Sequence, residues 1–515
     1  MHTPPSPAWP ICFGLETEVG ISVLEDPEAD VVEESIQLVR CATAHGIPNL
    51  WDYATEDPHV DARGFRAREL LQDTDEADYF SQDSSRTLSW LEIKSDLVLR
   101  NGARLYNDHA HPEYSTPECA TLAELIAQDK AGERILEECA RLASKERGHT
   151  VRLYKNNTDF LGHSYGCHEN YLIPRQTSFD RLVAGMTPFL VTRQIYTGAG
   201  KVGWEAEGKS LGSGYQLSQR ADFFTELVSI DTMNRRPLVN TRDEPHADPE
   251  KFRRFHVILG DANMSEFSTW LKVGTTALVL EALGREAAPP DWQLADPLAA
   301  HQSISRDPTW GWKIQRADGK TLTAIDLQRL YLNWTERLVD RSHPEKVAVL
   351  VAWRETLEAL ERDPNELRDR LDWVAKRWLL DTFRAAEKLE WSDPWLQSLD
   401  LEYHHLKRDE GLYYALEESK EIQRVVHEAD VIRAMQHPPL STRAYVRGRC
   451  VQKFGSALQS AQWDKLALRH GNQIYRLDLS RAFAGGELEA LMRAVDDSDS
   501  VPDFIARLKL SPVVS

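Results

Sequence analysis

The sequence lacks most features of secreted, membrane and nucleic-acid-binding proteins. Its six cysteines are scattered through 515 residues without a CxxC pair, which favours a reducing, cytoplasmic setting over a disulfide framework. No apolar run approaches the roughly 20 residues of a membrane helix, and the N-terminal segment lacks the regions of a signal peptide. The net charge of −20 disfavours a broad basic surface for nucleic acid. We therefore expect neither a membrane nor a nucleic acid as partner.

Two common phosphate-binding motifs are also missing. The chain has no GxxxxGK[ST] loop and no GxGxxG dinucleotide signature between a predicted strand and a predicted helix, so any bound nucleotide must be held by another scaffold. What the chain does have is 42% hydrophobic residues and 15 tryptophans, enough for a sizeable core in two or more domains. Arginine clusters at 233–244, 251–256 and 442–450 favour a local anion site, although each alone fits a solvated surface equally well.

Hydrophobic periodicity predicts strands early in the chain and helices late. Residues 11–23 alternate as a strand, 27–46 have the pattern of a helix closed by Gly46, and 321–390 are mostly helical. Because no regular βαβ rhythm appears, we predict an α+β fold. Further predicted elements are a helix over 121–148, a strand pair at 151–160 and 167–174, a strand at 255–264 and a helix over 265–286.

Two segments interrupt this pattern. Residues 52–98 are acidic, rich in Asp and Ser and weakly periodic, which is typical of a functional lid or a mobile insertion. The stretch HPPLSTRAYVRG at 437–448 is predicted to be a linker to a small C-terminal unit. The chain therefore divides into a large part, 1–436, and a small part, 437–515.

The segment GLETEVG places Glu16 and Glu18 on one face of a predicted strand. Two carboxylates about 7 Å apart on one strand face repel each other unless a cation lies between them, and hard cations such as Mg²⁺ take oxygen ligands. An exposed acidic strand edge is the alternative. The apolar neighbours of the pair favour a buried strand, where unpaired carboxylates are costly.

The segment NGARLYNDHAHPEYSTPE at 101–118 concentrates ionisable side chains. Read as extended backbone, it puts Arg104, Tyr106 and Asp108 on one surface. Glu113 and Tyr106 could join the metal, and Arg104 could meet a phosphate with its bidentate fork. Asp108 then has no obvious structural partner, which makes it the candidate base or nucleophile.

The same segment contains an HxH pair, His109 and His111. Without a cysteine or an HExxH motif nearby, this spacing is weak evidence for zinc. The carboxylates around it favour a hard metal instead.

Further polar groups lie on or beside predicted strands. Residues 156–159 form a polar cluster, and the triplet 168–170, His-Glu-Asn, follows on the next strand. Arg242, His256 and Asn263 could contact nucleotide or phosphate. They could equally be buried polar groups with partners of their own.

These motifs resemble a known family, whose members act on the prokaryotic ubiquitin-like protein Pup. The family comprises a Pup ligase and a Pup deamidase/depupylase, carboxylate–amine ligase relatives with a glutamine-synthetase-like fold. The DHAHPEYS core, with DARGF upstream in a long insertion, is similar to the deamidase/depupylase branch. Asn107, where the family more often shows Val, and a longer insertion are departures. Other matching segments, which span nearly the whole chain, include GLETEVGI, KNNTDFLGHSYGCHENYL, NTRDEPHAD, HVILGDANMSEFSTWLKVGTTALVL and STRAYVRGRC.

The resemblance implies a catalytic domain over 1–436, with an antiparallel sheet cradle flanked by helices, and a C-terminal domain over 437–515 that contributes to the nucleotide site. It implies Mg²⁺ and ATP, or ADP plus phosphate, as cofactors, with the nucleotide not consumed. Asp108 is the implied catalytic residue. The metal candidates are Glu16, Glu18, Tyr106 and Glu113; the nucleotide candidates are Arg104, Thr116, Asn157, Glu169, His256, Asn263, Arg443, Arg447 and Trp463, the last on the resemblance alone; the substrate candidates are His111, Arg220 and Arg242.

The implied function is hydrolysis at the C-terminal Gln or Glu side chain of a Pup-like tag, by deamidation or by isopeptide cleavage from pupylated proteins. Asp108 would attack the side-chain carbonyl or position a water. Two alternatives stay open: a ligase that uses ATP to join the tag to lysines, and a nucleotide-bound adaptor that only sequesters the tag. Arginines 193, 235, 236 and 242 are candidates for a basic track that accepts an acidic tag.

Overall fold

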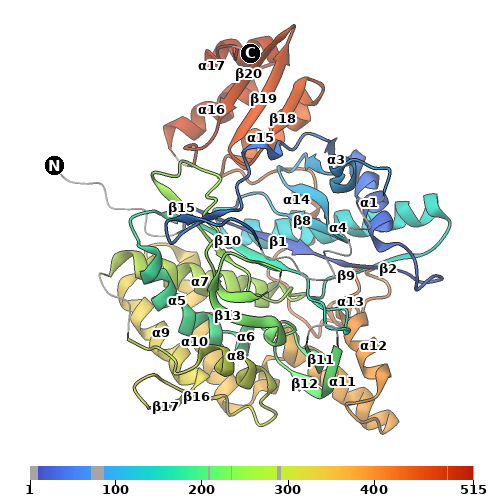
Figure 1. Ribbon diagram of the computed structural model, residues 1–515, viewed down its shortest axis with the longest axis vertical. Coiled ribbons are helices and arrows are strands. Elements are labelled where there is room, and N and C mark those ends of the chain that lie inside the picture. The colour runs from blue at the N-terminus through green and yellow to red at the C-terminus, as the bar shows by residue number, and fades with distance from the viewer. Residues whose placement is uncertain are drawn as a thin grey trace.

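A seven-stranded sheet lies at the centre of the protein. The computed structural model describes residues 10–70, 86–206, 209–233, 235–286, 291–483 and 485–513. The sheet order is β15-β10-β1-β8-β7-β6-β3, with every neighbouring pair antiparallel. Figure 1 shows this sheet between a helical body below and the C-terminal elements above. Its strands are β15 (Phe252–Val257), β10 (Cys167–Pro174), β1 (Cys12–Glu18), β8 (His111–Ser115), β7 (Arg104–Asp108), β6 (Leu97–Leu99) and β3 (Gly46–Pro48).

The sheet has one apolar and one polar face, because successive side chains on a strand point to opposite sides. On β1, Phe13 and Leu15 belong to the main hydrophobic core, whereas Glu16 and Glu18 point the other way. Helices α4 (Leu122–Arg147) and α7 (Glu266–Arg285) pack against the apolar side. The polar side is therefore left to form a site.

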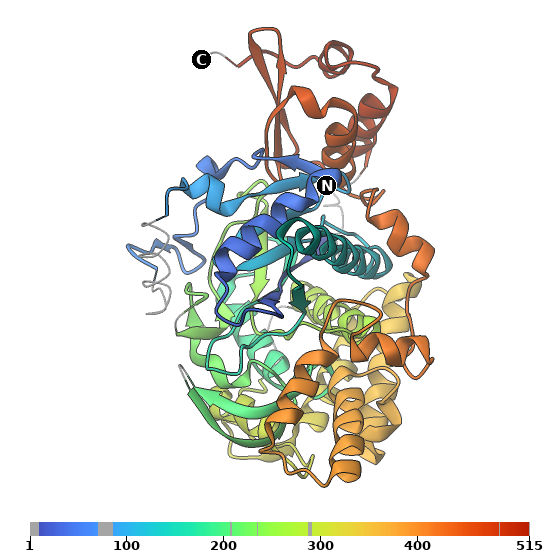
Figure 2. The same cartoon turned by 90° about the vertical axis from the view of Figure 1, so that its right-hand side faces the viewer.

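Long helices enclose the core below the sheet. The predicted helix over 121–148 is confirmed as α4, which begins with a capping box between Thr121 and Glu124 and ends at Gly148 in the left-handed conformation. Turning the molecule shows α4 beside the sheet and the C-terminal elements at the top (Figure 2). The other helices of this part are α1 (Val31–Arg40), α5 (Phe179–Thr192), α6 (Gln194–Thr197), α8 (Pro297–Arg306), α9 (Ala324–Leu338), α10 (Pro344–Arg362), α11 (Asp372–Glu387), α12 (Pro394–Tyr403), α13 (Leu412–Glu418) and α14 (Glu428–Ala434).

Short two-stranded ladders surround the central sheet. The predicted pairing of 151–160 with 167–174 is wrong, because β9 is shorter and pairs with β2, while β10 pairs with β1 and β15. The predicted strand at 255–264 ends at Val257. The ladders are β2 (Gly20–Val23) with β9 (Val151–Tyr154), β4 (Val60–Asp61) with β5 (Phe65–Arg66), β11 (Lys201–Ala206) with β12 (Lys209–Gln216), β13 (Phe224–Ser229) with β14 (Arg236–Asn240), and β16 (Lys313–Gln315) with β17 (Thr321–Thr323).

The prediction that Gly46 ends a helix is wrong. Helix α1 stops at Arg40, a 3₁₀ turn follows over Cys41–Ala44, and Gly46 begins strand β3. A Cβ on Gly46 would lie 2.6 Å from the carbonyl oxygen of Val98 on β6. The glycine is therefore required by the close approach of two strands and not by a helix cap.

The C-terminal elements enclose a hydrophobic cluster of their own. A three-stranded sheet of β18 (Leu458–Ala461), β19 (Lys465–His470) and β20 (Gln473–Asp478) packs with α15 (Ala444–Phe454), α16 (Gly486–Asp497) and α17 (Val501–Leu508). The cluster also includes Trp51 and Val98 from the first hundred residues. The prediction of a linker over 437–448 is wrong from Ala444 onward, where the chain is helical and largely buried.

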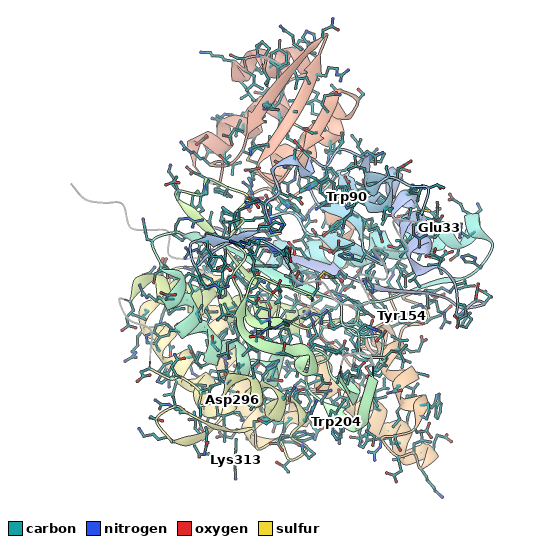
Figure 3. All side chains as sticks on the ribbon, viewed as in Figure 1. Glu33, Trp90, Tyr154, Trp204, Asp296 and Lys313 are labelled. Carbon is teal, nitrogen blue, oxygen red and sulfur yellow. The ribbon has the colours of Figure 1, made fainter. Side chains whose placement is uncertain are left out.

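The acidic segment 52–98 contains ordered parts. It includes β4, β5, the first two residues of strand β6 of the main sheet and a short helix, α3 (Trp90–Lys94). Trp90, which is labelled in Figure 3, is 48% exposed. Residues 71–85, which carry much of the predicted lid, lie outside the described residues. None of the helices in the described ranges combines the length and apolarity needed to span a membrane. The predicted α+β class, with an antiparallel sheet cradle and flanking helices, is confirmed.

Candidate active site

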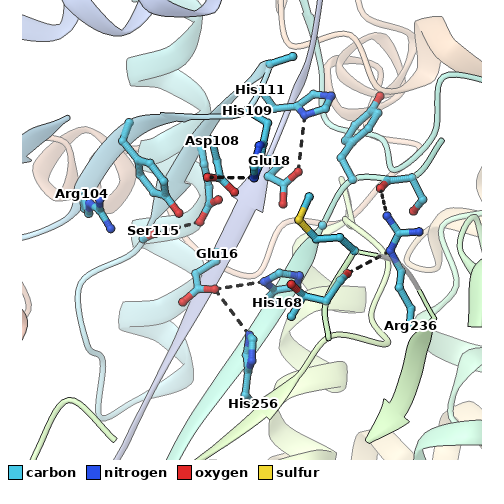
Figure 4. A pocket seen from close by; sticks show the side chains of 18 of the residues that line it. Glu16, Glu18, Arg104, Asp108, His109, His111, Ser115, His168, Arg236 and His256 are labelled. Atoms are coloured by element: carbon cyan, nitrogen blue, oxygen red, sulfur yellow. Dashed lines mark hydrogen bonds and ion pairs between the residues drawn. The ribbon is translucent and has the colours of Figure 1, made fainter. Parts of the chain in front are cut away.

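A cavity of about 760 Å³ opens on the polar face of the central sheet. Its floor consists of side chains from β1, β7, β8, β10 and β15, which are drawn in Figure 4. Its walls come from the loops at 159–166 and 232–246 and from Trp463 of the C-terminal elements. The cavity therefore gathers residues that are far apart in the sequence.

Strand register explains why these side chains meet. Glu16 on β1 lies opposite His168 on β10, and Glu18 lies opposite Glu113 on β8. Glu113 in turn lies opposite Tyr106 on β7. Side chains that face each other across a ladder lie on the same face. The predictions that Glu16 and Glu18 share a face, and that Arg104, Tyr106 and Asp108 share one, agree with this arrangement.

Three carboxylates crowd together at the centre. Glu18, Asp108 and Glu113 each offer an oxygen within 4.8 Å of the others. Burial, followed by the charge of Asp108, raises the pKa of Glu113 well above its usual range, and the same two causes raise the pKa of Glu18. Such a group of acids is stabilised either by a retained proton or by a bound cation.

Asp108 differs from its two neighbours because a lysine contacts it. The Nζ of Lys94 donates a hydrogen bond to Oδ1 of Asp108 at 2.5 Å. Although burial opposes ionisation, Lys94 and then His109 hold the pKa of Asp108 below its usual range. Asp108 is therefore the ionised member of the group. Lys94 was not among the residues that the sequence singled out.

Glu16 belongs to a second group, with His168 and His256. It accepts hydrogen bonds from Asn170 at 3.0 Å and, at 3.2 Å, shares one with His168 Nδ1. Burial opposes its ionisation, but the His168 hydrogen bond and the charges of His256 and Arg254 lower its pKa. The sequence suggested that Glu16 and Glu18 hold one ion together, whereas the structure groups Glu16 with imidazoles and Glu18 with carboxylates.

Five arginines line the cavity and are called the arginine wall here: Arg104, Arg220, Arg236, Arg242 and Arg254. Buried Nε atoms of Arg104, Arg242 and Arg254 make no hydrogen bond within the described part of the chain, and neither does His256 Nε2. Burial and the nearby Arg236 lower the pKa of Arg220 to about 10. Buried donors without partners are rare in native structures, so this wall fits an anion that supplies the missing acceptors.

A second, smaller cavity of about 70 Å³ continues from the first. It is lined by Thr116, Glu118, Arg443 and Trp463 among others. Glu118 forms ion pairs with Arg443 at 2.8 Å and with the fully buried Arg447. Arg447 also donates to the Trp463 carbonyl at 2.9 Å and lies 4.8 Å from its ring centre. Arg447 thus orients Trp463 from behind without lining either cavity.

The predicted substrate contacts His111, Arg220 and Arg242 all line the main cavity. His111 stacks on Tyr165 at 4.4 Å, with Nδ1 3.7 Å from Glu18. Burial, followed by the charge of His109, lowers its pKa to about 4. It is therefore a neutral imidazole near pH 7.

Besides Arg447, three predicted nucleotide contacts do not line either cavity. Glu169 points to the opposite face of β10 from His168, because it is one residue out of phase, and pairs with Arg193 at 2.5 Å. The side-chain oxygen of Asn157 accepts from the Ala262 backbone at 2.6 Å. Asn263 donates to Asp372 at 3.0 Å. These buried groups hold the fold together, so Asn157, Glu169 and Asn263 are removed from the candidate site.

Only two of the four arginines suggested as a basic track reach the cavity. Arg193 is buried in its pair with Glu169, and Arg235 pairs at the surface with Glu226. Arg236 and Arg242 reach the cavity. The residues that sequence reasoning missed are Lys94, His168, Arg254 and Glu118. Two of these had a signal in the sequence: His168 is part of the His-Glu-Asn triplet, and Arg254 belongs to the arginine cluster at 251–256.

Comparison with known proteins shows the family of the chain. The model of the Pup-ligase protein family matches residues 11–467. The chain belongs to that family. A depupylase of Acidothermus cellulolyticus is 46% identical over 88% of this chain and 90% of its own length. A Pup deamidase/depupylase of Mycolicibacterium smegmatis is 43% identical over 94% of this chain and 97% of its own. The crystal structure of Pup in complex with its ligase PafA matches with a TM-score of 0.77, at 30% identity over 98% of this chain and 96% of that one.

Membership of the Pup-ligase family restricts the reaction to the making or breaking of an amide bond. Membership alone does not decide between the two. Relatives named for hydrolysis match over most of both chains, and the ligase structure shares the whole fold. A scaffold common to amide formation and amide cleavage is expected when function depends on the site and not on the fold.

Proposed function

We propose that the protein is a hydrolase acting on the C-terminal side chain of a Pup-like modifier. It would release ammonia from a terminal Gln and would cleave the isopeptide bond between a terminal Glu and a substrate lysine. The observation that carries the proposal is the ionised Asp108 beside Glu18 and Glu113, with Lys94 fixed on it. The names of the relatives supply the substrate, and their matches cover nearly the whole chain.

The donor set fits a magnesium ion. Glu18 and Glu113 offer crowded carboxylate oxygens, and Glu16 and Tyr106 lie on the same sheet face. Oxygen-rich clusters of this kind suit Mg²⁺, and relief of carboxylate repulsion would favour its binding. When bound, the ion would polarise a carbonyl oxygen and stabilise the negative charge that develops on it.

The arginine wall and the smaller cavity fit ATP, or ADP with phosphate. Among the described residues, the buried Nε atoms of Arg104 and Arg254 find no hydrogen-bond acceptor, as expected of phosphate-binding groups before binding. Thr116, Arg443 and Trp463 line the continuation of the cavity, where a base would lie. We propose that Arg447 acts indirectly, by orienting Trp463.

Asp108 would carry the reaction. One carboxylate oxygen attacks the side-chain carbonyl carbon of the tag, the C–N bond breaks, and the nitrogen leaves with a proton from water. A second water then bonds to the same carbon, and the electron pair of the anhydride C–O bond returns to Asp108. Of the two protons released, one neutralises the hydroxide left by the first step and the other protonates the amine. By this mechanism the amide is hydrolysed through a covalent intermediate with Asp108.

The remaining parts of the chain have supporting roles in this proposal. Residues 1–436 would form the catalytic domain, and 437–515 a small domain whose Trp463 closes the nucleotide site. Arg236 and Arg242, with Arg220, would guide an acidic tag to the cavity. The cytoplasm is the proposed compartment, on the scattered cysteines of the sequence.

The test is a product analysis with purified protein, Mg²⁺, ATP, a tag ending in Gln and a tag–lysine conjugate. We expect ammonia and free lysine protein, with ATP consumed far more slowly than amide bonds are cleaved. New conjugate formed from a Glu-ended tag and an acceptor protein, with stoichiometric ATP consumption, would show a ligase instead. Tag binding without any product would show an adaptor.

A further inference from the structure

One lysine reaches the carboxylates of the cavity from the segment that precedes β6. Lys94 Nζ lies 2.5 Å from Asp108 Oδ1 and 5.5 Å from the centre of the Tyr106 ring. The side chains of Lys94 and Asp108 are only 16% and 25% exposed. A charge-assisted hydrogen bond between two largely buried side chains holds their relative positions better than an ion pair at the surface does.

The backbone holds Lys94 in place. The preceding residue, Ile93, is buried, and its carbonyl accepts a hydrogen bond from Asn107 Nδ2 at 3.1 Å. The same amide donates to the carbonyl of His109 at 2.9 Å. Asn107 therefore ties the end of α3 to the β7–β8 turn, which directly follows Asp108. The lysine approaches Asp108 from a fixed position.

Two side chains, Lys94 and His109, approach the same oxygen of Asp108. Lys94 and, at 3.9 Å, His109 Nε2 both approach Oδ1. A carboxylate held at one oxygen is oriented at the other. Attack on a carbonyl needs such orientation, because a reacting oxygen that points away loses the advantage of proximity.

We propose that Lys94 is a positioning residue of this site, which fixes Oδ1 of Asp108, directs the other oxygen to the tag carbonyl and stabilises the carboxylate released when the intermediate breaks down. The inference rests on the proposed function, since it concerns the same bond changes. In the first step the ammonium keeps Asp108 oriented while its free oxygen bonds to carbon. In the second it receives the returning negative charge through its N–H groups, and no atom of Lys94 is transferred.

The main test compares Lys94→Ala with Lys407→Ala, which removes a lysine paired with Glu410 at the surface, 49% exposed. With Mg²⁺, nucleotide and tag at saturation, we expect Lys94→Ala to slow single-turnover hydrolysis about a hundredfold, as for loss of one preorganised donor. Affinity for tag and nucleotide should change by less than about threefold. Lys407→Ala should behave as the wild type.

Chemical rescue separates catalysis from a merely structural role. Added ethylammonium, which carries N–H donors, should restore much of the lost rate of Lys94→Ala, whereas tetramethylammonium, which has none, should not. Lys94→Arg, which keeps donors and charge, should retain more activity than Lys94→Ala. No rescue by either cation, or equal rescue by both, would overturn the proposal.

A second readout needs neither turnover nor a Lys94 variant. Reaction of lysines with acetic anhydride, followed by mass spectrometry, should label Lys94 faster in Asp108→Asn than in the wild type, and Lys407 equally in both. Equal labelling of Lys94 would contradict the contact. If the wild type hydrolyses no tag amide, the proposed function fails and this inference with it. If the wild type is active and Lys94→Ala is within about threefold of it, only the inference on Lys94 fails.

Discussion

Replacing Glu118 by Gln tests how the C-terminal elements are held to the sheet. Glu118 lies just beyond β8, and its partners Arg443 and Arg447 lie at the start of α15. Burial opposes its ionisation, yet Arg447 and Arg443 lower its pKa to about 2 from the ordinary 4.5. That difference corresponds to about 3 kcal/mol of stability. Because Gln keeps the shape and removes the charge, Glu118→Gln should lower the free energy of unfolding by about this amount at pH 7.

The stability difference between the wild type and Glu118→Gln should depend on pH in a defined direction. A carboxyl with a lowered folded pKa contributes stability above its unfolded pKa and loses it as the pH falls through the folded value. The difference between the wild type and Glu118→Gln should therefore be constant from pH 7 down to about 5 and should shrink between pH 4.5 and 2. Arg447, left without its carboxylate partner, explains why the loss is large at neutral pH.

The assay must detect local loosening, because a chain with several hydrophobic clusters does not unfold in one step. Hydrogen exchange of residues 444–508, with urea midpoints from tryptophan fluorescence, should show earlier opening in Glu118→Gln. Glu487→Gln, an exposed residue of α16, is the control with the same change in charge. Equal behaviour of the two variants, or a difference that grows as the pH falls, would refute the reasoning.

Three further predictions concern the site. Trp463→Ala should weaken nucleotide binding about tenfold, equivalent to about 1.4 kcal/mol, without changing Mg²⁺ affinity; an unchanged nucleotide affinity in calorimetry would contradict its role. Because the pKa of Glu113 is raised, protons compete with Mg²⁺ for its carboxylate, so Mg²⁺ affinity should rise with pH and Mg²⁺ binding should release protons. Calorimetry in two buffers of different ionisation enthalpy measures this release. Mg²⁺ binding without proton release would contradict the prediction. Glu169→Gln should cost about 3 kcal/mol of stability by leaving Arg193 unpaired but should leave nucleotide affinity of the folded protein unchanged; the reverse pattern would restore Glu169 to the site.

Strand periodicity predicted which side chains share a face but not which strands are neighbours. Glu16 and Glu18, or Arg104 and Tyr106, alternate with buried residues on their own strand, so local sequence determines their orientation. Their grouping depends on the pairing of β1 with β8 and β10, which is set by tertiary packing. Glu169 was assigned to the site although it is one residue out of phase with the cavity face. His168 beside it faces the cavity, and Glu169 faces the core.

The residues that the sequence did not reveal lie in a weakly periodic segment or depend on partners far away in the chain. Lys94 ends a five-residue helix in an acidic stretch with weak periodicity, so nothing local connects it with Asp108. Arg254 and Glu118 acquire their roles from partners that are far away in the chain. Gly46 was misread because a glycine after a helix is common at a cap, whereas here it permits close strand pairing.

The central claim is that the carboxylate of Asp108 is the group that reacts. Single-turnover hydrolysis of a Gln-ended tag by Asp108→Asn, with Mg²⁺ and nucleotide at saturation, measures this directly. The control is Asp496→Asn, which removes a carboxylate paired with Arg449 near the surface. We expect Asp108→Asn to lose at least about a thousandfold in rate while binding tag and nucleotide as before, and Asp496→Asn to lose nothing. A rate for Asp108→Asn within about tenfold of the wild type would contradict the account.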